Sequence, residues 1–245
     1  MSTGESCLVQ QFRAYGPLRD ADRDLLLALE KDERAYGRDA RIYGQGEAVS
    51  SLYVIKTGWV CVHCLLDDGR RQIVDVKLPG DLIGLREVAF VETMSGATTL
   101  TEAVLCPFSK PRLSEVFERS PYLARLFFLI EARVQAGLCE RIVNLGQRDA
   151  FSRLCSFLVE LKLRLEMCGD ASGATFRFPF SQRLLGDLLG LSEVHVSRIL
   201  RRLREEGLAA VSREQVRILD WEHLQEEARF NPATLELDLG WVRSS

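Results

Sequence analysis

The sequence of 245 residues lacks the marks of export and of membrane insertion. Its first residues, MSTGESCLVQQF, contain no basic stretch followed by an apolar one, and each apolar run falls far short of the roughly 20 residues that a membrane span needs. The seven cysteines are odd in number and irregularly spaced, unlike the framework of a disulfide-rich secreted domain. These absences predict a cytoplasmic protein with reduced thiols and no membrane partner.

The net charge is small, and histidines are few. The formal net charge is −3 and the sequence pI is about 5.8, which excludes coating of nucleic acid by bulk charge, because that mode needs a broad basic surface to displace counterions. The three histidines, His63, His195 and His223, lie in different segments. An active site would need converging histidines and carboxylates, so we predict that the protein is not an enzyme.

Residues 40–107 have the pattern of a small antiparallel β-roll or barrel. The short alternating runs are Leu52 to Ile55, Trp59 to Leu66, Gln72 to Leu78 and Val104 to Cys106. Asp67-Asp68-Gly69 is a hairpin-turn sequence and Pro79-Gly80-Asp81 is another. A short amphipathic helix is expected earlier, between Pro17 and Lys31.

The stretch from Pro121 to Leu145 has the apolar spacing of a helix of about seven turns. Its stripe consists of Leu123, Leu126, Phe127, Ile130, Val134, Leu138, Ile142 and Leu145, and Tyr122, Phe128, Leu129 and Val143 widen it. Because one neighbour cannot cover so much apolar surface, the helix is either fully buried or packs against the roll and its own copy. We favour the dimer, with Leu123, Leu126, Phe127, Ile130, Val134 and Leu138 as the residues of the dimer helix.

A second helical domain follows, opened by a helix from Asp149 to Met167. Further on, Ser181 can cap a helix from Gln182 to Leu189, and the turn Gly190-Leu191-Ser192 leads to a second helix that ends at Gly207. Two helices joined by so short a turn form a helix-turn-helix. The residues expected to face inward are Leu185, Leu189, Leu191, Val196, Ile199, Leu200 and Leu203, with Gly186 allowing the helices to approach.

The second of these helices carries Arg198, Arg201, Arg202 and Arg204 with no acid among them. Arginine reads guanine, Glu193 can accept from cytosine, and an exposed Val194 suits a thymine methyl group. The alternative is that these arginines pair with Glu205 and Glu206 four residues on, but Arg198 has Arg202 at that position. We expect DNA contacts from Ser181, Gln182, Arg183, Ser192, Glu193, Val194, His195, Ser197, Arg198, Arg201, Arg202 and Arg213.

Arg213 belongs to a predicted wing. The runs Ala209 to Ser212 and Gln215 to Leu219 flank Arg213-Glu214, as two strands flank a hairpin turn. Arg213 is therefore expected to contact a phosphate.

The order of these parts, and the segment LGLSEVHVSRILRRLREEGL in particular, resembles the Crp/Fnr (catabolite activator and fumarate-nitrate regulator) superfamily of bacterial transcription regulators over roughly residues 15–225. The resemblance implies an α+β fold with an N-terminal antiparallel β-roll of the cyclic-nucleotide-binding type, a long central dimerisation helix and a C-terminal winged helix-turn-helix. It also implies a homodimer that binds and bends a palindromic DNA site and contacts RNA polymerase. The expected boundaries are 1–120 for the roll, 121–148 for the dimerisation helix, 149–230 for the DNA-binding domain and 231–245 for a tail.

Ser192, Glu193, Val194, Ser197 and Arg198 stand where this family reads bases. Val194 replaces the usual glutamate, so the family's half-sites should not be carried over, although Arg198 is retained.

The roll departs further from the family. Cyclic-AMP binders carry Gly-Glu and Arg-Ser-Ala, where this chain has Gly84-Leu85 and Ser95-Gly96-Ala97, with no cation at the phosphate position unless Arg86 or Arg70 substitutes. Only Cys7 lies near the start, which disfavours the iron–sulfur cluster of the oxygen-sensing branch. The signal is thus unidentified; we predict no cofactor, and a small-molecule effector stays open. Its candidate pocket comprises Leu82, Gly84, Leu85, Arg86, Ser95 and Ala97.

Two features stay open at this level. Cys61 and His63 share a face if their segment is a strand, which keeps a redox-, haem- or metal-responsive regulator as an alternative, with a β-roll enzyme more distant. The main expectation is that Val60, Val62 and Cys64 lie in the roll core and that the other face of the strand meets the central helix. The tail alternates Leu235, Leu237, Leu239 and Trp241, which fits either an added strand or a flexible end.

Overall fold

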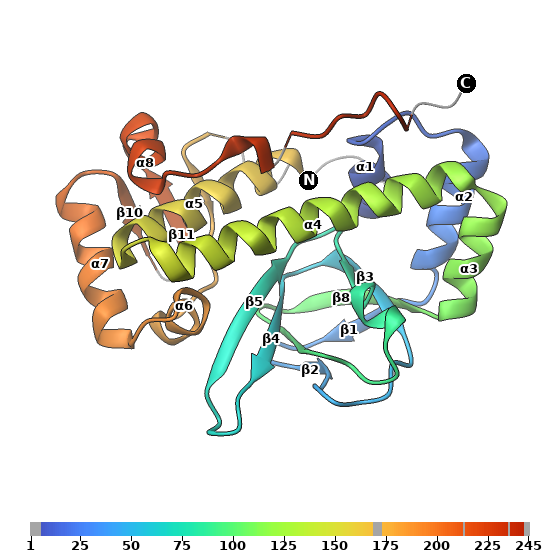
Figure 1. Cartoon of the computed structure of the whole chain (residues 1–245), viewed down its shortest axis with the longest axis horizontal. Coiled ribbons are helices and arrows are strands. Elements are labelled where there is room, and N and C mark those ends of the chain that lie inside the picture. Colours follow the sequence, from blue (N-terminus) through green and yellow to red (C-terminus); the bar gives the residue numbers. More distant parts are fainter. Residues whose placement is uncertain (1–5, 169–172, 213, 235, 243–245) are drawn as a thin grey trace. The chain divides into compact units, whose positions relative to one another are not determined.

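The chain forms two compact units joined by a long helix (Figure 1). The structure is a computed structural model, and it describes residues 6–168, 173–212, 214–234 and 236–242. Unit 1 comprises Met1–Gln135 together with Glu236–Ser245, and unit 2 comprises Ala136–Leu235. The helix α4 (Pro121–Gln147) runs from one unit into the other. The predicted α+β class and the order of roll, long helix and helix-turn-helix are confirmed.

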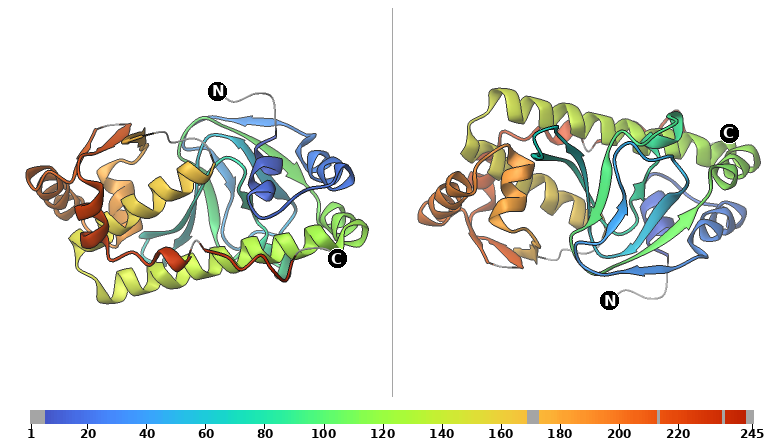
Figure 2. Two further views of the ribbon diagram at one scale, coloured as in Figure 1. Left: turned by 90° about the horizontal axis from the view of Figure 1, so that it is seen from above. Right: turned by 90° about the horizontal axis from the view of Figure 1, so that it is seen from below.

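Unit 1 is built on two four-stranded antiparallel sheets (Figure 2). The first has the order β1-β8-β3-β6 and the second has the order β2-β7-β4-β5. The strands are β1 (Arg34–Tyr36), β2 (Arg41–Tyr43), β3 (Leu52–Thr57), β4 (Val60–Leu65), β5 (Arg71–Lys77), β6 (Leu82–Ile83), β7 (Gly96–Thr99) and β8 (Ala103–Phe108). Both predicted turns are present, because the Leu66 amide donates to the Arg70 carbonyl and the Asp81 amide to the Leu78 carbonyl, each at 2.9 Å.

Short helices cover this roll. They are α1 (Cys7–Arg13), α2 (Asp20–Leu27), the 3₁₀ turns η1 (Ala28–Glu30) and η2 (Arg86–Ala89), and α3 (Lys110–Arg119). The helix expected between Pro17 and Lys31 corresponds to α2 and η1. Leu25, Leu26 and Leu29 lie in one hydrophobic cluster with apolar residues of α1, β3 and the first half of α4.

That cluster corrects the residues assigned to dimerisation. Leu123, Leu126, Phe127 and Ile130 are each at most 3% exposed inside unit 1, so they pack against their own chain. Periodicity shows that a stripe is covered but not by what, and here α1, α2 and α3 cover it. Val134 and Leu138 are half-buried. The large apolar side chains that α4 leaves exposed are Phe128 (64%), Ile142 (69%) and Val143 (45%).

Unit 2 consists of helices around a small sheet. Its elements are α5 (Ala150–Met167), β9 (Thr175–Arg177), α6 (Gln182–Leu189), α7 (Glu193–Glu205), β10 (Ala209–Val211), β11 (Gln215–Ile218), α8 (Trp221–Ala228) and η3 (Pro232–Thr234). The sheet order is β10-β11-β9, so the wing has a third strand beyond the two expected. In the described part of the chain, no helix combines the length and apolar character that crossing a membrane requires.

Candidate nucleic-acid interface and effector pocket

The helix-turn-helix begins and ends where its capping residues predict. The Ser181 hydroxyl accepts from the Leu184 amide at 3.2 Å at the start of α6, and the Ser192 hydroxyl accepts from the His195 amide at 3.3 Å at the start of α7. Gly190 ends α6 at φ +67°, in the left-handed region that favours glycine. These local signals fix the turn that presents α7.

Gly186 lets the two helices of the motif approach closely. Across the turn, the Leu191 amide donates a hydrogen bond to the Gly186 carbonyl at 3.0 Å. A Cβ atom at position 186 would lie 2.5 Å from the Leu191 carbonyl oxygen, inside van der Waals contact with backbone that cannot easily move.

We therefore expect Gly186→Ala to destabilise unit 2 by about 1–3 kcal/mol, because the clash outweighs the gain of about 1 kcal/mol in helix propensity. Gly146→Ala in α4 is the matched control, since its added Cβ meets nothing within 4 Å. Thermal unfolding of both variants measures the difference. A Gly186 variant as stable as the Gly146 variant would contradict the close approach.

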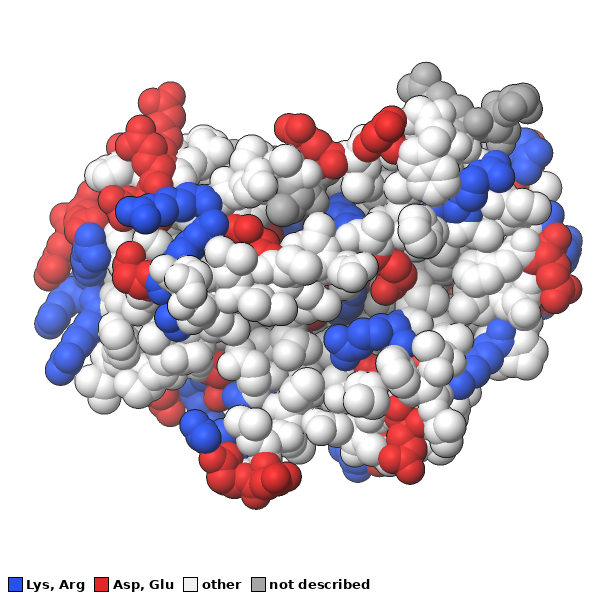
Figure 3. Space-filling view, viewed as in Figure 1, with Lys and Arg blue, Asp and Glu red and all other residues white. Residues whose placement is uncertain are grey.

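The outward face of α7 carries the residues expected to read bases. Ser192, Glu193, Val194, His195, Ser197, Arg198 and Arg201 are all exposed, whereas Val196, Ile199 and Leu203 are at most 5% exposed. Val194 is 64% exposed, although burial of its apolar side chain would stabilise the unit. Ser181, Gln182 and Arg183 at the start of α6 are exposed too. Figure 3 shows basic side chains gathered along α7.

The arginines of α7 differ in their surroundings. Arg202 hydrogen-bonds Glu206 at 2.6 Å, which raises the pKa of its guanidinium, and its guanidinium lies 3.8 Å from the centre of the Phe151 ring. Arg201 lies 3.8 Å from Glu205, with both side chains mostly exposed. Arg198 has no ion pair or hydrogen bond from its side chain to any residue of the described ranges. Arg202 is thus held against α5, while the charge of Arg198 is available.

The wing adds two arginines that the sequence reasoning missed. Arg217 of β11 and Arg177 of β9 are both exposed, and the two strands pair with Gln215 opposite Arg177. The alternation of a strand could have revealed them, because Arg217 follows the buried Val216 and Arg177 follows the buried Phe176. Arg213 lies outside the described residues.

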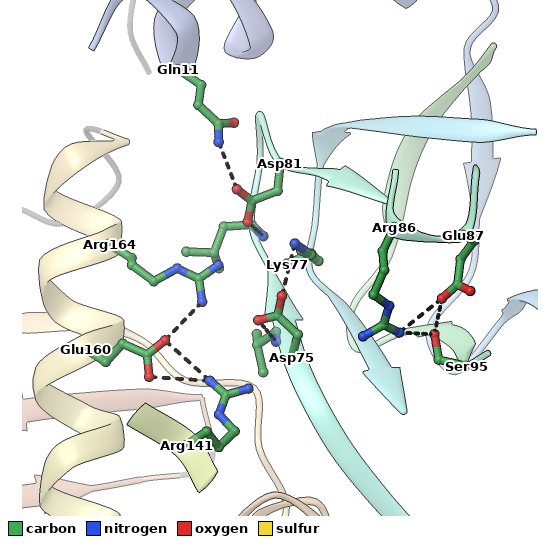
Figure 4. A network of polar contacts seen from close by, with 12 residues as sticks. Gln11, Asp75, Lys77, Asp81, Arg86, Glu87, Ser95, Arg141, Glu160 and Arg164 are labelled. Carbon is green, nitrogen blue, oxygen red and sulfur yellow. Dashed lines mark hydrogen bonds and ion pairs between the residues drawn. The ribbon is translucent and has the colours of Figure 1, made fainter. Parts of the chain in front are cut away.

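In unit 1, the candidate effector pocket is occupied by a polar network of the chain's own side chains (Figure 4). Arg86 Nη2 donates to Ser95 Oγ at 2.8 Å and to Glu87 Oε1 at 3.0 Å, and the Ser95 hydroxyl donates to the same Glu87 oxygen at 2.7 Å. The Met94 amide donates to Glu87 Oε2 at 2.7 Å. Arg86 therefore contacts Ser95, the residue that stands in place of the family's arginine in the sequence, whereas Arg70 pairs with Asp68 in the β4–β5 turn.

Glu87 is the residue that holds this network and the one that the sequence did not reveal. It is 2% exposed. Burial raises the pKa of its carboxyl, but the hydrogen bonds from Ser95, Met94 and Arg86 outweigh burial, so the pKa lies below its ordinary value. Leu82, Ser95 and Ala97 are buried around it, and Gly84 and Leu85 precede it on the chain.

Glu87→Gln is expected to lower the free energy of unfolding by about 1–3 kcal/mol at pH 7, because Arg86 and the Met94 amide lose a charged acceptor. A carboxyl with a lowered folded pKa stabilises the fold above its unfolded pKa and loses that effect as the pH falls through the folded value. Urea unfolding at pH 7 and below pH 4.5 should show the difference between the two proteins shrinking in acid. A constant difference would contradict the assigned role.

The cysteines were candidates for a metal or redox site. In the ranges that the structure describes, no three His, Cys, Asp or Glu side chains gather as a metal site would require. Val60 and Val62 of β4 are buried as expected, but Cys64, which was expected in the core with them, is partly exposed. Cys61 is fully buried and His63 is 8% exposed on the other face. Burial raises the pKa of Cys106 to about 11 and that of Cys155 to about 12, so neither is a ready thiolate.

Comparison with known proteins agrees with this architecture. A family model described as the Crp-like helix-turn-helix domain matches residues 152–227, and one described as the cyclic nucleotide-binding domain matches residues 33–120. A DNA-binding helix-turn-helix that follows a roll of this kind in the sequence defines a class of transcription regulators.

Full-length relatives narrow the class. The nitrogen fixation regulation protein FixK of Rhizobium meliloti is 33% identical over 176 residues, which cover 72% of this chain and 77% of that protein. The transcriptional activator protein FnrA of Stutzerimonas stutzeri is 29% identical over 199 residues, 81% of each chain. The structure of FixK2 from Bradyrhizobium japonicum is similar with a TM-score of 0.72 and 29% identity, covering 79% of this chain and 95% of that one. The chain belongs to the Crp/Fnr family of transcription regulators.

Proposed function

We propose that the protein is a homodimeric, sequence-specific regulator that places α7 of each copy in the major groove of a palindromic DNA site. The observation that carries this proposal is the exposed face of α7, where Glu193, Val194, Ser197 and Arg198 project with no other part of the described chain over them. A glutamate, a small apolar group and an arginine without an ion-pair partner are base-reading types at the end of the helix that enters the groove.

The outer surface of α4 supports pairing of two chains. Its exposed residues between positions 128 and 143 are Phe128, Gln135, Cys139, Ile142 and Val143, none of them charged. The stretch has four charged residues. Three of them engage their own chain: Arg133 lies over the Tyr15 ring at 5.2 Å, Glu140 pairs with Arg148 at 2.8 Å, and Arg141 pairs with Glu160 at 3.3 Å. The fourth, Glu131, is partly buried, and burial raises its pKa. Phe128, Gln135 and Ile142 are seven residues apart, the spacing of a seam between two helices.

The signal is proposed to differ from cyclic AMP. An anionic ligand would have to compete with Glu87 for the Arg86 guanidinium and would place its charge next to a buried carboxylate. The regulator is therefore expected to bind DNA without cyclic nucleotide. The relatives named as transcriptional activators support contact with RNA polymerase as part of the same proposal.

Selection of bound duplexes from a random pool tests the function directly. The protein without added ligand should enrich an inverted repeat whose half-sites are about 10 base pairs apart, because a two-fold dimer presents its recognition helices one helical turn, roughly 34 Å, apart. A pool that stays random, or that converges on a single unrepeated motif, would overturn the proposal.

A further inference from the structure

The C-terminal segment Glu236–Val242 folds back onto unit 1. Val242 is 1% exposed within the hydrophobic cluster that α4 shares with α1 and α2, and Leu237 and Leu239 pack against that cluster. The Val242 amide donates to the Leu239 carbonyl at 3.3 Å. The described residues of the segment form no strand and lie beside α4 (Figure 2), whereas Leu235, the first of the alternating residues, lies outside the described ranges.

Trp241 is the exception in this anchored segment. It is 52% exposed, and its ring meets the 64%-exposed ring of Phe128 on α4 edge to face, with centroids 6.1 Å apart and an angle of 81°. Two large aromatic side chains thus contact each other while more than a third of each still faces outward. Exposed aromatic pairs of this kind are typical of the energetically dominant part of a protein interface.

The pair lies at the end of the uncharged surface of α4. Phe128 starts the seven-residue spacing that continues through Gln135 to Ile142, and Figure 3 shows mostly uncharged residues along the helix. In a two-fold pairing, groups near the axis face their own copies, so like charges there would repel, and an uncharged surface avoids this repulsion. A charged partner protein would find no complementary group among these exposed residues.

We propose that Trp241, held in place by Val242, extends the dimer surface of α4 and contacts the same Phe128–Trp241 pair, or the helix beside it, in a second copy of the chain. This inference rests on the proposed dimerisation through α4. It gives the C-terminal segment, which lies beyond the residues matched by the family models, a role in assembly.

Sedimentation equilibrium of the full chain tests the proposal with four proteins. Trp241→Ala should raise the dimer Kd by about 10- to 30-fold relative to the wild type, as expected for the loss of a large aromatic contact at an interface. Phe90→Ala is the matched control, since Phe90 is also an exposed aromatic residue of unit 1 (45%) but lies in another loop, and its Kd should not change. Ile142→Glu is the reference variant, in which dimerisation through α4 should be lost.

A second measurement does not depend on how well the alanine variant folds. Dilution of the wild type through its dimer Kd should shift tryptophan emission to the red as Trp241 becomes exposed, and Trp241→Phe should remove the shift while it keeps the dimer. If Trp241→Ala dimerises like the wild type, or dilution gives no shift, the inference is overturned while the α4 dimer stands. If Ile142→Glu still dimerises, the α4 dimer surface is wrong and the inference falls with it.

Discussion

Arg198→Ala is expected to weaken binding to the selected DNA site about 5- to 150-fold, the equivalent of ~1–3 kcal/mol for a bidentate contact between arginine and guanine. The reason is the position of Arg198 on the exposed face of α7 with no ion pair inside the described chain. Because the lost contact reads one base pair, the variant should also accept other bases there. Fluorescence anisotropy with the selected duplex and its single substitutions measures both effects.

Two arginine variants make this result specific. Arg204→Ala changes an exposed arginine six residues further along α7, on another side of the helix, and should leave affinity and selectivity nearly unchanged. Arg217→Ala in the wing should weaken all sequences alike and lower the salt slope by about 0.9, the expected effect of one lost phosphate contact. An Arg198 variant that behaves like the Arg217 variant would argue against base reading.

Ile142→Glu is expected to abolish dimerisation, with a rise in dimer Kd of at least about 1,000-fold, because two carboxylates would be buried together across the two-fold axis. Ile142 is 69% exposed in the single chain, so the substitution should leave the chain folded. The monomer should lose tight binding to the inverted repeat, since each half-site would then be bound alone. Sedimentation and anisotropy on the same samples measure both consequences.

The matched control is Val91→Glu, which places the same new charge on a side chain that is 88% exposed in unit 1. It should change neither assembly nor DNA binding. A dimeric Ile142→Glu protein would show that the chains pair through a surface other than α4.

The elements with local signals could be predicted from the sequence, and those that depend on distant partners could not. Ser181, Gly190 and Ser192 cap or end their helices within a few residues, so the bounds of α6 and α7 follow from the chain itself. The strands β1 and β2 have three residues each and pair with β8 and β7, some 60 residues away, so neither stands out alone.

The candidate sites divide in the same way. Helical spacing was enough to predict the outward residues of α7. It could not predict the network of Arg86 and Glu87 with Ser95, because Ser95 joins it only after the chain has passed through η2 and the following loop. The apolar spacing of α4 predicted burial but not whether Leu123 or Phe128 faces the unit's own core. Leu237 and Leu239 alternate like a strand, yet it is Val242, outside the alternating positions, that anchors the segment.

The central claim is that a pair of chains reads two adjacent turns of one duplex groove through α7. Hydroxyl-radical footprinting of the wild type on its selected site, with the number of chains per duplex counted by sedimentation, tests it most directly. We predict two chains on each duplex and two protected segments whose centres lie about 10 base pairs apart, with half-sites related by a two-fold axis. One chain per duplex with a single protected segment would contradict it.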